Sequence, residues 1–133
     1  MKPFSQELFD ADDHAKHKVI SWLVTRGVQA EVNPDTYGID LIEIDGPRAW
    51  EVEVKHNWSG HYFPFRTVHI AARKLKFAQP NWFFSILNHE HTHAIFIKGE
   101  IAALSQVITK DTALTSAEDF IEVPCADTWM MKL

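Results

Sequence analysis

The residues best suited to chemistry are two acids and a lysine, Asp40, Glu53 and Lys55. They lie on two segments, residues 39–44 and 49–55, that are rich in β-branched and aromatic side chains. The turn formers Asp-Gly-Pro-Arg separate these segments. The pattern predicts an antiparallel β-hairpin, which would bring the three side chains together.

The length of the turn sets the register of this hairpin. A four-residue loop pairs Ile44 with Ala49 and places Asp40 opposite Glu53, with their Cβ atoms roughly 5 Å apart. Lys55 then lies on the same face, about 7 Å farther along the strand. The sequence therefore predicts that the two acids and the lysine share one face of the hairpin.

Two facing carboxylates repel each other unless they share a proton, a cationic side chain or a metal ion. Lys55 supplies one such charge, and a hard divalent ion such as Mg²⁺ is commonly held by one or two carboxylates. A bound ion would polarise a phosphate and acidify the attacking water, while the lysine stabilised developing negative charge. This chemistry suits phosphodiester hydrolysis. Glu51 lies on the same face, where a solvated or outer-shell role is expected.

At these residues the chain resembles the PD-(D/E)XK nuclease superfamily, whose D…ExK motif Asp40, Glu53 and Lys55 match. The resemblance implies a restriction-endonuclease-like fold and Mg²⁺-dependent DNA cleavage, with Mn²⁺ able to substitute. It implies that Asp40, Glu53 and the carbonyl of Val54 bind the metal and that Lys55 is the catalytic lysine. The superfamily includes phage nucleases and archaeal Holliday-junction resolvases. The expected activity is that of an endo- or exodeoxyribonuclease, whose substrate could be a junction, a flap or an end.

The alternative at these residues is a surface hairpin in which Glu53 and Lys55 form an ion pair of little energetic consequence. A second alternative keeps the fold without the chemistry, as a non-catalytic nucleic-acid-binding or protein-binding module. None of the three motif residues is lost, which favours the enzyme.

Residues 7–26 predict an amphipathic helix that stops at Gly27. Its apolar stripe consists of Leu8, Ala11, Ala15, Val19, Trp22 and Leu23. Asp12 falls within this stripe on a helical wheel, so its carboxylate would point toward the core. The superfamily often places an acid on the first helix beside the metal, and the resemblance assigns that catalytic role to Asp12. A first-turn acid that complements the helix dipole is the alternative.

The formal charge of −5 by itself argues against nucleic-acid binding, but the charge is unevenly distributed. Residues 54–89 contain no Asp or Glu and are rich in aromatic side chains. Their five cations, which leave −10 for the rest of the chain (−5 minus +5), are Lys55, Arg66, Arg73, Lys74 and Lys76. This segment predicts a DNA-backbone surface at the last four residues. A solvated helix face is the alternative for any one of them.

The other elements follow from local pattern. A helix is predicted for residues 68–77 after Thr67 as N-cap, with its basic side chains outward. Residues 101–108 fit either helix or strand. Further strands are predicted at residues 28–32, 82–87, 94–97 and 120–123. Together they predict one α/β domain over residues 1–133, with a mixed central sheet that contains an antiparallel meander and is flanked by helices.

Three histidines alternate in the connection between two predicted strands, at His89, His91 and His93. In an extended conformation they would share a face and could bind a transition metal. No second cluster in the sequence completes a tetrahedral set, and a polar loop tip explains these residues as well.

Composition bounds the setting of the protein. Cys125 is the one cysteine, no apolar run approaches 18 residues, and no signal peptide is recognisable. These features predict a cytoplasmic protein that does not enter a membrane. A small domain with one site would have to form a homodimer to cut both DNA strands at once.

Overall fold

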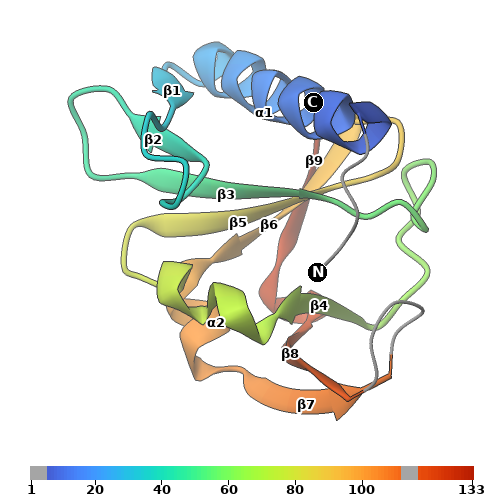
Figure 1. The fold of residues 1–133 in the computed structure, drawn as a ribbon. Coiled ribbons are helices and arrows are strands. Elements are labelled where there is room, and N and C mark those ends of the chain that lie inside the picture. The colour runs from blue at the N-terminus through green and yellow to red at the C-terminus, as the bar shows by residue number, and fades with distance from the viewer. Residues whose placement is uncertain (1–5, 112–116) are drawn as a thin grey trace.

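The structure, a computed structural model, describes residues 6–111 and 117–133, apart from the side chains of residues 7–9. A long helix covers one face of a six-stranded sheet, and a three-stranded sheet with short helices lies on the other side (Figure 1). The expected position of Leu8 in the apolar stripe falls outside the described side chains. The α/β class with a mixed sheet is confirmed.

Helix α1 (Gln6–Thr25) buries the predicted stripe through Ala15, Val19 and Leu23. It ends at Gly27, whose φ of +76° suits a residue without a Cβ. There the N–H of Val28 donates to the carbonyl of Leu23, which satisfies a carbonyl left open at the helix end. The predicted glycine stop is therefore confirmed.

The large sheet has the strand order β1-β2-β3-β5-β6-β9. Strands β3 and β5 are parallel, and the other neighbours are antiparallel. The predicted meander and the two strands after it are confirmed, while β9 was not predicted. The strand bounds are β1 (Ala30–Val32), β2 (Leu41–Glu43), β3 (Ala49–Val54), β5 (Trp82–Leu87), β6 (His93–Lys98) and β9 (Trp129–Lys132).

The helix predicted over residues 68–77 is wrong in its first half. Strand β4 (Thr67–Ala71) occupies that half, and only Ala72–Phe77 forms a short 3₁₀-helix, η1. Val68 and Ile70 alternate with polar neighbours, and this period of two fits a half-buried strand. The strand partner lies far away in the sequence, so the local pattern alone favoured the helix.

That partner is β8 (Glu118–Pro124), which pairs with β4 on one side and with β7 (Gln106–Lys110) on the other. Both forms left open for residues 101–108 occur, because α2 (Gly99–Leu104) precedes β7. The predicted closing strand at 120–123 is confirmed within β8. A single 3₁₀ turn, η2 (Cys125–Asp127), leads to the edge strand β9.

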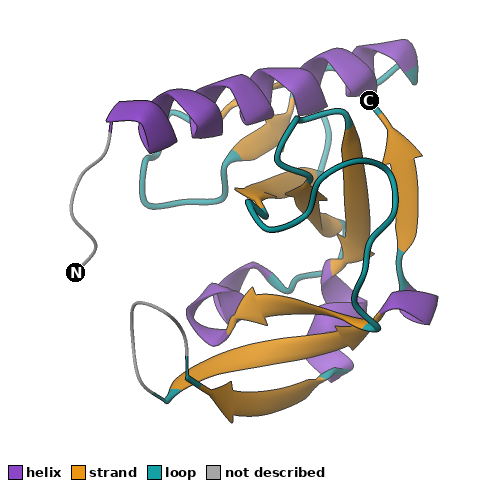
Figure 2. Cartoon of the chain, turned by 90° about the vertical axis from the view of Figure 1, so that its right-hand side faces the viewer, coloured by secondary structure: helices purple, strands orange, loops and turns teal. Residues whose placement is uncertain are grey.

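The large sheet packs on both faces, as Figure 2 shows from the side. Leu41, Trp50 and Val52 belong to the cluster that packs against α1. A second buried cluster joins Phe84 and Ile86 of the large sheet to Val68, Ile70, Ile121 and Val123 of the small one. Because side chains alternate along a strand, the polar residues of β3 point toward the side of the small sheet.

Candidate active site

The hairpin that carries the predicted site forms, but its register differs from the prediction by two residues. Ala49 pairs with Ile42 rather than with Ile44. The same register places Asp40 across from Glu51, so the predicted direct opposition of Asp40 and Glu53 is wrong. A shift of two residues keeps every side chain on its predicted face.

The loop chemistry explains this register. The Glu43 carboxylate accepts hydrogen bonds from the Arg48 guanidinium at 2.9 and 2.8 Å and from its backbone N–H at 3.2 Å. These hydrogen bonds close the loop one residue earlier in the sequence than predicted. Residues 44–47 therefore form the loop. Asp45 adopts a φ of +60° inside it, which Asp tolerates better than most residues. Turn composition alone cannot distinguish two loops offset by one residue.

Asp40 and Glu51 are joined through the backbone at the point where the strand ladder stops. The N–H of Val52 donates to Oδ2 of Asp40 at 2.8 Å, and the N–H of Asp40 donates to Oε1 of Glu51 at 3.2 Å. Glu51 is only 7% exposed, so the solvated role expected for it is wrong. The two carboxylates therefore replace ladder hydrogen bonds and stand side by side at the mouth of the hairpin.

A lysine approaches each of these acids from a different layer of the fold. Lys16 of α1 lies 3.5 Å from Asp40, and Lys74 of η1 lies 3.2 Å from Glu51. The acid pair is thus held between the helix on one side of the sheet and η1 on the other. Lys74, predicted to face outward, is instead committed to an internal ion pair.

Asp12 is exposed and does not point into the core as predicted. Partial burial of its carboxyl nevertheless raises its pKa, and the charge of Asp40 raises it further. Lys16, His56 and Lys74 act in the opposite direction. The structure therefore places Asp12 within electrostatic reach of Asp40.

The pKa of the Glu51 carboxyl is strongly shifted. Burial raises its pKa from 4.5 to about 7, against the attraction of Lys74 and with a further increase from Asp40. Glu51 therefore changes its protonation state close to neutral pH. Raised carboxyl pKa values of this kind are typical of functional sites, although structural ion-pair networks also produce them.

This pKa predicts how stability should vary with pH. A carboxyl with a raised folded-state pKa stabilises the fold fully below 4.5, and that stability is lost as pH rises through about 7. Over this pH range the loss of unfolding free energy is at most on the order of 3 kcal/mol. Glu51→Gln should remove this loss and so flatten the decline in melting temperature with rising pH. Glu31→Gln, at an exposed site on β1, is the control. A Glu51→Gln protein with the wild-type pH slope would contradict the assignment.

Glu53 and Lys55 lie farther along the same face of β3. Nζ of Lys55 lies 5.2 Å from the centre of the Phe65 ring. Burial lowers the pKa of Lys55, Lys110 lowers it further, and Glu53 opposes the shift. Lys55 lies roughly 13 Å along the strand from Glu51, so the predicted set divides into two neighbouring groups. The Val54 side chain between them points away, into the core.

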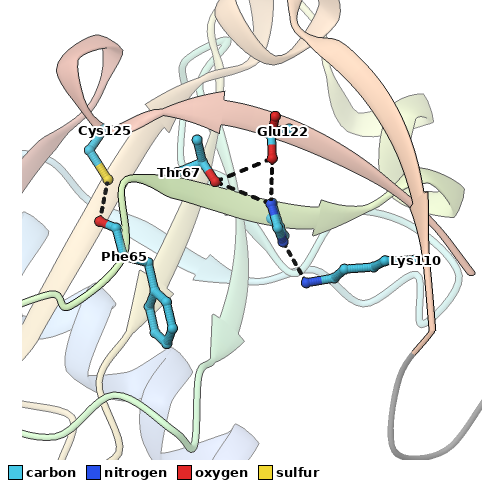
Figure 3. Close-up of polar contacts among 6 residues, drawn as sticks. Phe65, Thr67, Lys110, Glu122 and Cys125 are labelled. Carbon is cyan, nitrogen blue, oxygen red and sulfur yellow. Dashed lines mark hydrogen bonds and ion pairs between the residues drawn. The ribbon is translucent and has the colours of Figure 1, made fainter.

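Lys110 was not among the predicted site residues, yet its charge contributes to the lowered pKa of Lys55. Its ammonium lies 2.6 Å from Nδ1 of His69, whose Nε2 is 2.9 Å from a carboxylate oxygen of Glu122. Figure 3 shows Lys110 and Glu122 at the two ends of this chain of contacts, with Thr67 beside Glu122. The alternation of residues 67–70 was the signal for β4, but no sequence pattern predicts that β7 joins the same sheet on the other side of β8.

The predicted DNA-binding residues are divided between two environments. Arg66, Arg73 and Lys76 are exposed. Lys76 also lies 5.1 Å from the centre of the Phe77 ring, which leaves its charge at the surface. Lys74 is held at Glu51. Three of the four predicted residues therefore lie at the surface.

The described residues contain no group of three or more His, Cys, Asp or Glu side chains arranged to hold a metal ion. In the same residues no helix is long and apolar enough to cross a membrane. Neither the family models, nor the curated proteins, nor the solved structures with which the chain was compared match it.

Proposed function

We propose that the protein is a metal-dependent nuclease that hydrolyses phosphodiester bonds in DNA, on a restriction-endonuclease-like fold. The observation that carries the proposal is the meeting of Asp40 with the buried Glu51, with Glu53 and Lys55 next on the same strand face. Full ionisation of a buried acid beside a second acid requires additional positive charge. A divalent ion would supply it.

The side chains present fit Mg²⁺ or Mn²⁺. Mg²⁺ is usually bound by one or two carboxylates and keeps several waters, so Asp40 and Glu51 suffice as protein ligands. Glu53 and the Val54 carbonyl lie farther along β3 and would complete a longer ligand set. A bound ion would polarise the phosphate and acidify the attacking water. Lys16 and Lys74 supply part of this positive charge, at 3.5 Å from Asp40 and 3.2 Å from Glu51.

Three further side chains have separate tasks in this proposal. Lys55 stabilises negative charge that develops on the phosphate. Its lowered pKa means that it loses its proton at a lower pH than an ordinary lysine, which limits activity in alkali. Asp12 orients the attacking water from α1. A metal held by Asp40 would take over the charge that Lys16 now supplies there.

The exposed cations of η1 should contact the DNA backbone. Changing Arg73 and Lys76 together to Ala should weaken DNA binding and reduce the slope of log affinity against log salt by roughly 2, because each phosphate contact releases counterions. Binding is measured by fluorescence anisotropy over a range of salt concentrations.

The matched control is Lys98→Ala with Lys132→Ala, which removes the same charge from exposed positions of β6 and β9. Lys110 is unsuitable as a control because it acts on Lys55. Equal losses in the two double variants would show that the DNA surface lies elsewhere.

A second candidate function follows from the fact that both acids already have partners within the protein. Asp40 and Glu51 each have a lysine partner and a backbone hydrogen bond, which is also what a purely structural cluster would show. The chain would then be a non-catalytic nucleic-acid-binding or protein-binding module. In that case substitutions at these acids alter stability and no activity.

The deciding experiment is a cleavage panel with duplex, single-stranded, flap and four-way-junction DNA, each with Mg²⁺, Mn²⁺ or EDTA. The nuclease proposal predicts cleavage of at least one substrate that EDTA abolishes. Binding without cleavage on every substrate would favour the binding module instead.

A further inference from the structure

A cavity of about 330 Å³ opens where the loop after β3 meets β6, η2 and β9. Five of the residues that line it carry aromatic rings, namely His61, Tyr62, Phe63, Phe65 and Trp129. Among the described residues around it there is no Asp or Glu. Pockets for small ligands measure roughly 300–1,000 Å³, so this one suits a single small planar group.

Three of these rings present much of their surface to solvent. Tyr62 is 73% exposed, Phe65 is 42% exposed and Trp129 is 37% exposed. A single exposed aromatic residue needs no explanation, whereas a cluster of exposed apolar side chains around a cavity marks a binding site. The exposed rings therefore indicate a ligand with a flat face that can stack on them.

The walls of the cavity are held in place by contacts within the protein. Phe63 packs edge-on against the buried Trp58, with ring centroids 5.2 Å apart, and against Phe65 at 5.3 Å. Sγ of Cys125 donates to the carbonyl of Phe65 at 3.3 Å, which joins η2 to this wall (Figure 3). Preorganised walls lose little conformational entropy when a ligand binds.

The cavity adjoins Lys55 through one of its rings. Nζ of Lys55 lies 5.2 Å from the centre of the Phe65 ring, and the next residue along the chain, Arg66, is exposed. Both cations belong to the segment 54–89, which contains no acid. Cations beside exposed aromatic rings are the combination with which proteins bind single-stranded nucleic acid, because the cations meet phosphates and the rings meet bases.

We propose that this cavity binds one unpaired nucleobase of the DNA, next to a phosphate held at Lys55. Every base has a face that can stack on an aromatic ring, so binding here is independent of sequence. A base inside a duplex is paired and stacked, and it could enter only after extrusion at an energetic cost. The inference rests on the proposed action on DNA and narrows the substrate class to single strands, flaps and junctions with an unpaired base.

The test is Tyr62→Ala, because Tyr62 is the most exposed of the three rings and its removal should leave the fold intact. Binding of a short single-stranded oligothymidylate is measured by fluorescence anisotropy in EDTA, so that no divalent ion contributes. Affinity should fall roughly fivefold or more, the scale for removal of one stacking ring. Tyr62→Phe keeps the ring and should bind like wild type. Affinity for a blunt duplex should be equal in all three proteins.

The matched control is Tyr37→Ala, which removes another exposed tyrosine, 89% exposed, from the turn before β2. It should bind the single strand like wild type. Equal single-strand affinity in Tyr62→Ala and wild type would overturn the proposal, and so would an equal loss on blunt duplex. No single-strand binding by wild type at micromolar concentration would also overturn it and would favour a protein partner for the cavity.

These binding results are distinct from the outcome of the cleavage panel. Ring-dependent binding of single strands without any cleavage would support the cavity and contradict the nuclease. Cleavage of blunt duplex that EDTA abolishes, without ring-dependent binding of single strands, would support the nuclease and contradict the cavity.

Discussion

Replacing Asp40 with asparagine should abolish metal-dependent cleavage of DNA while leaving the hairpin folded. Asparagine keeps an oxygen that can accept the Val52 N–H, now bound to Asp40 at 2.8 Å. It lacks the negative charge that a divalent ion requires. Loss of metal catalysis is worth several kcal/mol, or on the order of 10³-fold in rate. Single-turnover cleavage and melting with and without Mn²⁺ would measure both effects.

Asp13→Asn is the matched control, because it removes an exposed acid of α1 one residue from Asp12. Its cleavage rate and its Mn²⁺-dependent melting shift should equal those of wild type. A comparison of Glu51→Gln with Glu53→Gln then shows which acid of β3 acts with Asp40. The observed register favours Glu51. An Asp40→Asn protein that cleaves at the wild-type rate would refute the acid pair as the metal site.

Local sequence patterns were sufficient to predict the elements that depend only on residues close together in the sequence. The stripe of α1, its stop at Gly27 and the meander of β1, β2 and β3 could all be predicted because period and turn chemistry are properties of neighbouring residues. The shared face of Asp40 and Glu53 also follows from period alone and survives an even register shift.

The details that decide the chemistry depend on contacts between distant segments. The hydrogen bonds between Glu43 and Arg48 set the position of the loop and therefore the register. In this register Asp40 lies opposite Glu51 and not opposite Glu53. Whether a polar side chain is solvated or held is likewise set by tertiary packing and not by its neighbours in sequence.

The same limit explains the error at residues 68–77 and the histidine pairs. Strand β4 is stable because β8 supplies its backbone partners, and nothing near β4 in the sequence announces β8. The basic residues after it were read as an outward helix face, although Lys74 is bound to Glu51. His89, His91 and His93 lie against His56, His14 and His61, which are distant from them in the sequence.

The second large effect is expected at Lys55, where the nuclease and the binding module differ most. If Lys55 stabilises charge that develops only in the transition state, Lys55→Ala should lower cleavage by roughly 10²-fold or more and leave DNA binding within a few-fold. Lys55→Arg should rescue poorly, because a planar guanidinium does not reproduce a compact ammonium. Single-turnover cleavage in Mg²⁺ and equilibrium binding in Ca²⁺, on the same substrate, separate the two effects.

The surroundings of Lys55 define the alternative that this experiment must distinguish. Lys55 is grouped with Glu53, Phe65 and Lys110, not with the acid pair, so the alternative to a catalytic role is a structural role within that group. Lys98→Ala, at an exposed lysine of β6, removes the same charge elsewhere and should change neither rate nor affinity. A binding module would show a modest loss of affinity in Lys55→Ala and no activity to lose. Wild-type cleavage by Lys55→Ala would remove Lys55 from the mechanism, because a group that stabilises the transition state cannot be deleted without cost to the rate.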